Sequence, residues 1–198
     1  MQPAEPAEET SDEELFAAFA RAGDEGAMSA LVARHGAVLL AFLAGWCEER
    51  EDALDLAQET WLRAMRSPRA FRGGSFRAWL LRIARNLAID RLRRRRPELS
   101  LDAPAGPEDD APPFAESVPD ASSPPPDEVL AGQEEKAALL AAVRTLPAEQ
   151  RDVLLLRIAD IPFSEIAGRF GIPLNTALGR MHYAMKRLRA ALCPERRN

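Results

Sequence analysis

The chain has 198 residues, of which 31 are acidic and 26 are Lys or Arg, so its formal net charge is −5 at pH 7. It has no run of about twenty apolar residues and no charged-then-apolar amino terminus of the secretory type, which predicts a cytoplasmic protein without direct membrane insertion. Cys47 and Cys193 lack metal-ligand spacing, so we expect no disulfide, no metal and no cofactor.

The charge is distributed unevenly along the chain. Residues 1–14 contain six acids and no base, and residues 97–135 contain eleven acids and no base. The second segment also holds nine of the sixteen prolines, a composition that cannot bury enough surface to offset its ordering entropy. The sequence therefore predicts a disordered N-terminus over residues 1–10 and a flexible acidic, proline-rich linker over residues 98–127.

Before the linker, apolar residues recur at helical spacing and predict four helices. They form one expected domain, residues 11–97. Ser11 followed by Glu14 is a capping box that opens the first helix, and Ser75 is placed to cap the fourth after a glycine pair. The expected ranges of the four helices are 11–23, 26–46, 50–66 and 75–96.

The third and fourth helices carry opposite charge. We expect the third to pack through Leu54 and its apolar neighbours, and to leave acids on its other faces. Twelve arginines, no lysine and one acid lie between Arg63 and Arg96. Aromatic residues run through this stretch, which favours a folded surface that binds nucleic acid over a merely solvated arginine-rich helix. An acidic helix beside a basic one predicts two different partners.

Three aromatic residues of the basic stretch have distinct expected positions. Trp79 falls on the apolar side of the fourth helix and is expected in the core. Phe71 and Phe76 flank the glycine turn, where their rings are placed to meet an unstacked base.

After the linker, a second helical domain is expected over residues 128–193, with Leu139 among its core residues. Ala167 is small where two helices would cross, and Gly171 permits the positive φ that a tight turn requires. This pattern predicts a helix-turn-helix, whose second helix enters the major groove of DNA. The fold class is thus all-α, two small domains joined by a linker. The expected helices of the second domain are 128–144, 148–159, 164–171 and 174–192.

Ordered sequence blocks in both domains resemble one known family, the extracytoplasmic-function sigma factors of bacterial RNA polymerase. Region 2 of that family resembles Asp55-Leu56-Ala57-Gln58-Glu59-Thr60-Trp61 followed by Phe71 through Arg94. Region 4 resembles Leu146-Pro147 with Arg151 and Leu154, followed by Ser164 through Leu192.

The resemblance implies a subunit that is not an enzyme. It would bind core RNA polymerase at the largest-subunit clamp and at the flap, recognise the −10 and −35 elements of promoter DNA, and assist melting. An anti-sigma factor is a further implied partner.

The resemblance also implies roles for particular residues. Those expected to bind polymerase are Asp52, Asp55, Leu56, Gln58 and Glu59. Those expected at the −10 element and the melted strand are Arg72, Ser75, Phe76, Arg82, Arg85, Asn86, Arg91, Arg93 and Arg94. Those expected at the −35 element are Asn175, Thr176, Leu178, Arg180, His182 and Lys186.

The recognition helix departs from the family pattern. Leu178 stands where a basic residue is common, and Tyr183 where arginine is frequent, so we expect a weak −35 contact. Gly179 replaces the usual serine and costs about 1 kcal/mol relative to alanine inside a helix, which indicates a close approach of DNA or of a neighbouring helix. His182 is either a base reader or an exposed polar residue, and His35 is expected to be structural.

Two other function classes fit the sequence less well. A free-standing helix-turn-helix regulator that binds duplex DNA without polymerase would leave the arginine-rich first domain unexplained. An enzyme acting on nucleic acid has little support, because no carboxylate cluster, metal-ligand set or activated nucleophile stands at useful spacing.

Overall fold

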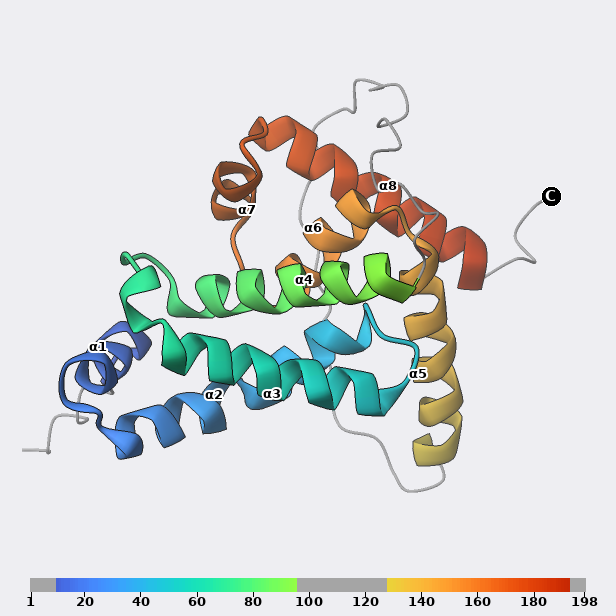
Figure 1. Cartoon of the computed structure of the whole chain (residues 1–198). Coiled ribbons are helices and arrows are strands. Elements are labelled where there is room, and N and C mark those ends of the chain that lie inside the picture. The colour runs from blue at the N-terminus through green and yellow to red at the C-terminus, as the bar shows by residue number, and fades with distance from the viewer. Residues whose placement is uncertain (1–9, 96–127, 193–198) are drawn as a thin grey trace, which may run out of the picture. The chain divides into compact units, whose positions relative to one another are not determined.

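The computed structural model describes residues 10–95 and 128–192. The predicted linker, Arg96, Cys193 and all but the last residue of the predicted disordered N-terminus lie outside the described residues. Within the described ranges every secondary-structure element is a helix, as the sequence predicts (Figure 1). It divides into two compact units. Unit 1 comprises residues up to Leu43 with Glu49–Leu92, and unit 2 comprises Ala44–Glu48 with residues from Arg93 onward.

The four predicted helices of the first part are confirmed to within two residues at each end. The capping box is also confirmed, because the Ser11 hydroxyl accepts from the backbone of Glu14 while the Glu14 carboxylate accepts from the backbone of Ser11. These hydrogen bonds lower the pKa of Glu14. The first helix ends at Gly23, whose φ of 67° is left-handed. The elements are α1 (Asp12–Ala22), α2 (Glu25–Ala44), α3 (Arg50–Arg66), the 3-10 turn η1 (Pro68–Ala70) and α4 (Phe76–Arg95).

The core of unit 1 contains a cluster of four aromatic rings. Phe16 of α1 lies at its centre, with ring centroids 5.6 Å from Phe71, 4.9 Å from Phe76 and 5.2 Å from Trp79. Trp79 is buried, which confirms its predicted place in the core. Rings at these distances and tilts stabilise one another beyond their simple burial.

Helix α2 is a core helix of unit 1. Among the described helices it is the one whose length and composition would let it cross a membrane. One face of the helix packs inside the protein, where Leu31, Leu39 and Leu43 are fully buried, while Val32 is exposed on another face. His35 is buried among them, which confirms its predicted structural position.

Two leucines predicted to be in the core are exposed. Leu54 is 44% exposed because the buried face of α3 runs through Ala53 and Leu56, and Leu54 falls on the opposite side of the helix. Leu139 is 43% exposed because burial along α5 begins one turn later, at Ala142. Both predictions are wrong, for different reasons: the helical phase of Leu54 turns it away from the core, whereas Leu139 shares a face with buried Ala142 and Val143 but lies one turn before the core begins.

Unit 2 contains the helix-turn-helix. Helices α7 and α8 pack against each other (Figure 1). Gly171 has φ 63° and Ala167 is buried, as predicted, and Ala177 of α8 is buried as well. The guanidinium of Arg151 caps the preceding helix by donating to the carbonyl oxygens of Arg144 (2.6 Å) and Leu146 (2.9 Å). Burial lowers the pKa of Arg151. The helices are α5 (Glu128–Thr145), α6 (Ala148–Ile158), α7 (Phe163–Phe170) and α8 (Leu174–Leu192).

Candidate functional site

Helix α3 has an exposed face that combines acids with one apolar side chain. Asp55 and Gln58 point to solvent, and the side chain of Asp55 is 69% exposed. Exposed Glu51 and Leu54 lie on the same face, because residues three and four apart are neighbours on a helix. Glu59 lies at the edge of this face and pairs with Arg63 one turn further on, Nε to Oε1 2.9 Å. The face offers a partner negative charge around an exposed leucine.

Two of the residues expected to bind polymerase are buried inside unit 1. Asp52 is 5% exposed and forms an ion pair with Arg91 of α4, so its carboxylate links two helices. Leu56 is also 5% exposed and packs in the core. Both side chains fall on the side of α3 that faces the core, so neither is turned to solvent in this structure, and their contact with polymerase stays a prediction.

The loop between η1 and α4 contains two consecutive glycines with positive φ, 93° at Gly73 and 79° at Gly74. Ser75 follows and caps α4, its hydroxyl accepting from the backbone of Ala78 at 3.2 Å. Phe76 is 0% exposed within the aromatic cluster, so its ring does not reach solvent in this structure, and its contact with an unstacked base stays a prediction. Phe71 is partly exposed, and Arg72 is exposed beside the glycines. Two left-handed glycines let the backbone turn with no side chain in the way.

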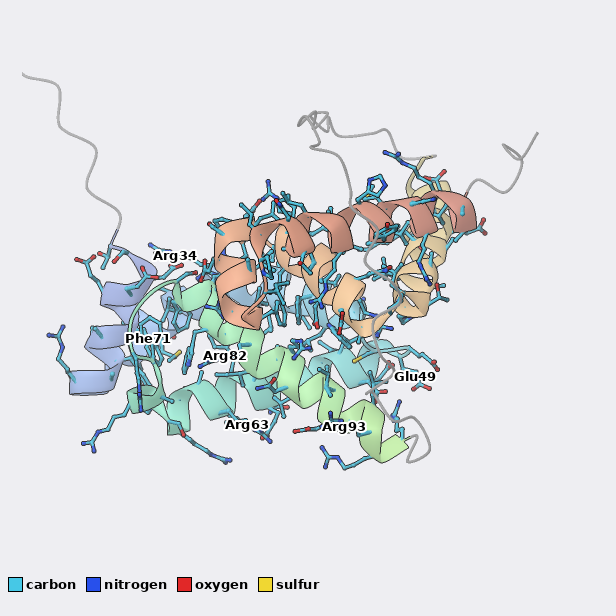
Figure 2. All side chains as sticks on the ribbon, turned by 90° about the horizontal axis from the view of Figure 1, so that it is seen from above. Arg34, Glu49, Arg63, Phe71, Arg82 and Arg93 are labelled. Carbon is cyan, nitrogen blue, oxygen red and sulfur yellow. The ribbon has the colours of Figure 1, made fainter. Side chains whose placement is uncertain are left out.

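Helix α4 presents a polar face away from the core. Arg82, Asn86 and Arg93 are exposed and lie on one side of the helix, because they are separated by one and then two turns. Figure 2 labels the two arginines on α4. Arg85 is half-buried, and Arg94 is exposed near the C-terminal end. The exposed face thus places one amide between two guanidinium groups. Guanidinium groups bind phosphate oxygens in a bidentate manner, and an amide can donate to and accept from a base edge.

A partly buried cluster of Asp12, Arg34 and His35 lies where α1 meets α2. The ring nitrogen Nε2 of His35 is 2.6 Å from Oδ2 of Asp12, and Arg34 lies 3.1 Å from the other carboxylate oxygen. The second ring nitrogen, Nδ1, is buried without a hydrogen-bond partner. This geometry fits a neutral ring that donates through Nε2, since a proton on Nδ1 would be an unsatisfied buried donor. Burial lowers the pKa of His35, although Asp12 opposes the shift.

Helix α8 exposes one line of side chains that contains few charges. Asn175, Leu178, His182 and Lys186 are all exposed and recur at helical spacing on one face. Leu174 is exposed beside them. Thr176 is half-buried. On this face the first exposed cation of the helix is Lys186, three turns from the N-terminal end.

Arg180 stands apart from this exposed line. Its guanidinium is 2.6 Å from Oε2 of Glu149 on α6, and the side chain is 21% exposed. Gly179 has no atom of another helix near its missing side chain, so the predicted close approach of a neighbouring helix is wrong, and the approach of DNA stays a prediction. Judged by residue type alone, Arg180 is predicted to bind DNA. The sequence gives no sign of its partner on another helix.

Sequence reasoning missed three surface residues of this site. Glu51 and Leu54 belong to the exposed face of α3, and Glu149 holds Arg180. The first two could have been found from helical phase, because they stand four residues before Asp55 and Gln58 respectively. Glu149 gave no such signal, since its partner lies on a different helix.

Comparison with known proteins identifies the family to which the chain is similar. The family models for Sigma-70 region 2 and Sigma-70 region 4 match residues 31–98 and 136–188. The chain is similar to the ECF RNA polymerase sigma factor SigE of Mycolicibacterium smegmatis. The two are 34% identical over 186 residues, which cover 91% of this chain and 69% of SigE.

Two solved structures are similar over most of the chain. CnrH, in its complex with the cytosolic domain of CnrY, matches with a TM-score of 0.66 and 25% identity, over 93% of this chain and 99% of CnrH. The sigma factor RpoE, in complex with the anti-sigma factor NepR from Bartonella quintana, shares the fold with a TM-score of 0.60 and 23% identity, over 85% of this chain and 98% of RpoE. With both region models matched in order, the chain belongs to the ECF family of sigma factors, the regulatory subunits that direct core RNA polymerase to promoters and start transcription.

Proposed function

We propose that this sigma factor divides its contacts between two faces of one helical unit. The exposed face of α3, with Leu54, Asp55 and Gln58, binds the clamp of the largest polymerase subunit. The polar face of α4, with Arg82 and Asn86, binds the −10 element and its melted strand. The observation that supports this division is the packing of an acidic and a basic helix side by side (Figure 1), joined by the largely buried ion pair between Asp52 and Arg91.

The assignment of the domains follows the same reasoning. We assign polymerase binding, −10 recognition and melting to residues 11–97, and −35 recognition to α8 within residues 128–193, with residues 98–127 as the linker. Among the residues expected at the −10 element, Arg72, Ser75, Arg85, Arg93 and Arg94 surround the proposed pair. Arg91 acts indirectly, because it binds Asp52.

The remaining parts of the proposal concern partners and location. The protein acts in the cytoplasm without catalytic activity of its own, as a regulatory subunit of polymerase. An anti-sigma factor is a proposed partner, since RpoE was solved with NepR and CnrH with the cytosolic domain of CnrY. The flap of polymerase is the proposed contact of the second domain.

Two variants test the division of faces. Asp55→Lys with Glu59→Lys reverses charge on α3 and should abolish co-elution with core polymerase. Asn86→Ala should leave co-elution intact and remove promoter melting, measured by permanganate reactivity on a promoter found by start-site mapping after overexpression. If both variants fail equally in co-elution, the division is wrong.

The same assays distinguish this function from the alternative, a free-standing regulator that binds duplex DNA without polymerase. A sigma factor co-elutes with core polymerase and gives promoter-dependent transcription from the reconstituted holoenzyme. Selective binding of duplex DNA without polymerase, and no transcription with it, would support the regulator instead.

A further inference from the structure

Both ends of the glycine loop that precedes α4 are attached to α1. The loop runs from Phe71 to Ser75, and α1 also contacts η1, directly before the loop. Figure 2 shows Phe71 beside α1. The region 2 family model begins at residue 31, so α1 lies before the matched segment.

The attachment at the end of the loop is a hydrogen bond. The backbone N–H of Phe76, the first residue of α4, donates to Oε1 of Glu13 over 2.8 Å. The first N–H groups of a helix have no partner within the helix, and they lie at the positive end of its dipole. A carboxylate from another helix therefore satisfies one of these donors and fixes the point at which α4 begins.

The attachment at the start of the loop is an aromatic contact. Phe16 meets the ring of Phe71 edge to face, with centroids 5.6 Å apart and an interplanar angle of 86°. Phe16 also contacts Phe76 at 4.9 Å, so one ring touches both flanks of the loop. Glu13 and Phe16 are three residues apart and therefore lie on one face of α1.

Helix α1 is itself held by different residues. Asp12 binds His35 and Arg34 of α2, and the guanidinium of Arg34 also donates to the carbonyl oxygen of Thr10 over 2.7 Å. Because these contacts do not involve the loop, α1 can remain docked on α2 when the contact through Glu13 is removed.

We propose that Glu13 is a positioning residue for promoter melting, and that with Phe16 it holds the glycine loop in the shape that receives an unstacked base. The inference rests on the proposed function of unit 1 and adds α1 to it. Two glycines with positive φ leave the loop with many accessible backbone conformations. Fixing both of its ends limits that freedom before DNA arrives, which lowers the entropic cost of forming the pocket.

The test compares three variants in reconstituted holoenzyme. Glu13→Ala removes the acceptor, Glu13→Gln keeps a neutral oxygen acceptor, and Glu25→Ala removes an exposed acid of α2 as the matched control. Permanganate reactivity over time gives the rate of melting, and co-elution gives polymerase binding. All measurements are made well below the unfolding midpoint of each variant.

We expect Glu13→Ala to melt promoters about three- to tenfold more slowly, the range for loss of one partly exposed charge-assisted hydrogen bond. Polymerase binding should match that of the unaltered protein. Glu13→Gln should recover most of the rate, and Glu25→Ala should behave as the unaltered protein does. A role in folding alone would instead lower polymerase binding and melting together, and this outcome overturns the inference.

Two further outcomes are decisive. If Glu13→Ala melts promoters at the normal rate while Asn86→Ala fails, the proposed function stands and the inference about α1 is overturned. If the unaltered holoenzyme melts no promoter, the proposed function itself fails, so the two failures are distinguishable.

Discussion

The two aspartates of α3 should respond to substitution in opposite ways. Asp52 is buried and binds Arg91, whereas Asp55 points to solvent three residues later. Asp52→Asn keeps the side-chain volume and removes the charge, so it leaves a guanidinium partly buried beside a neutral amide. Asp55→Asn removes the same charge from the surface.

The expected loss of stability in Asp52→Asn depends on how exposed its partner Arg91 is. Removing one member of a fully buried ion pair costs about 3–5 kcal/mol. The Arg91 side chain is 29% exposed and also lies 3.9 Å from Asp55, so it can partly rehydrate and partly re-pair. We therefore expect Asp52→Asn to lower the free energy of unfolding by about 2 kcal/mol, the value typical of a hydrogen bond to a charged group. For a domain of this size, that corresponds to a midpoint lower by about 8–16 °C.

Thermal unfolding followed by circular dichroism measures the difference in stability between the two variants. Co-elution with core polymerase at low temperature measures their polymerase binding. Asp52→Asn should unfold earlier yet bind polymerase when folded. Asp55→Asn should change stability by less than about 0.5 kcal/mol, since it is exposed, and should weaken polymerase binding. If Asp52→Asn is as stable as the unaltered protein and loses polymerase binding, then its carboxylate faces the partner, and the reasoning from burial is refuted.

Three other predictions concern titration and the recognition helix. The lowered pKa of His35 means that the unfolded chain binds a proton more readily than the folded one, so stability should fall as the pH is lowered from about 7 to 5. Thermal unfolding at several pH values measures this loss, and the part due to His35 should be absent in His35→Gln. Glu149→Ala should release Arg180 toward DNA and steepen the salt dependence of −35 duplex binding by about one phosphate contact, unlike the charge-matched control Glu135→Ala. Leu178→Arg should tighten binding to matched and scrambled duplexes alike, whereas selective binding by the unaltered helix would identify Leu178 as an apolar reader.

Local signals make most of the fold predictable. Capping boxes, glycine turns and helical periodicity act over a few residues, so the roles of Ser11, Gly23 and Gly171 follow from their immediate neighbours in the sequence. The buried faces are harder to predict, because an apolar residue such as Leu54 lies outside the core when its helical phase turns it to solvent. Counting that phase from the buried neighbours Ala53 and Leu56 corrects the assignment.

The candidate site is only partly predictable, for a physical reason. The positions of exposed residues such as Asn86 depend on the periodicity of one helix and follow from the sequence. Asp52 and Arg180 make their contacts with another helix, Arg91 of α4 and Glu149 of α6, and no spacing rule links residues so far apart. From the sequence alone, a charged residue that pairs with a neighbouring helix of the same protein cannot be distinguished from one that binds an external partner.

A recognition helix with few exposed cations is compatible with the function of a sigma factor, because this protein does not search DNA alone. Once polymerase holds one domain at a promoter, the binding of the other becomes an intramolecular step governed by effective concentration rather than by its own affinity. The first exposed cation on the reading face of α8 is Lys186, whereas α4 carries Arg82 and Arg93 beside Asn86. Strong electrostatic binding by α8 would favour duplexes of any sequence, since phosphate contacts carry no sequence information. Under the proposed division of contacts, a weak second domain would make promoter choice depend on both elements being present, with the arginines of α4 providing affinity and α8 adding discrimination.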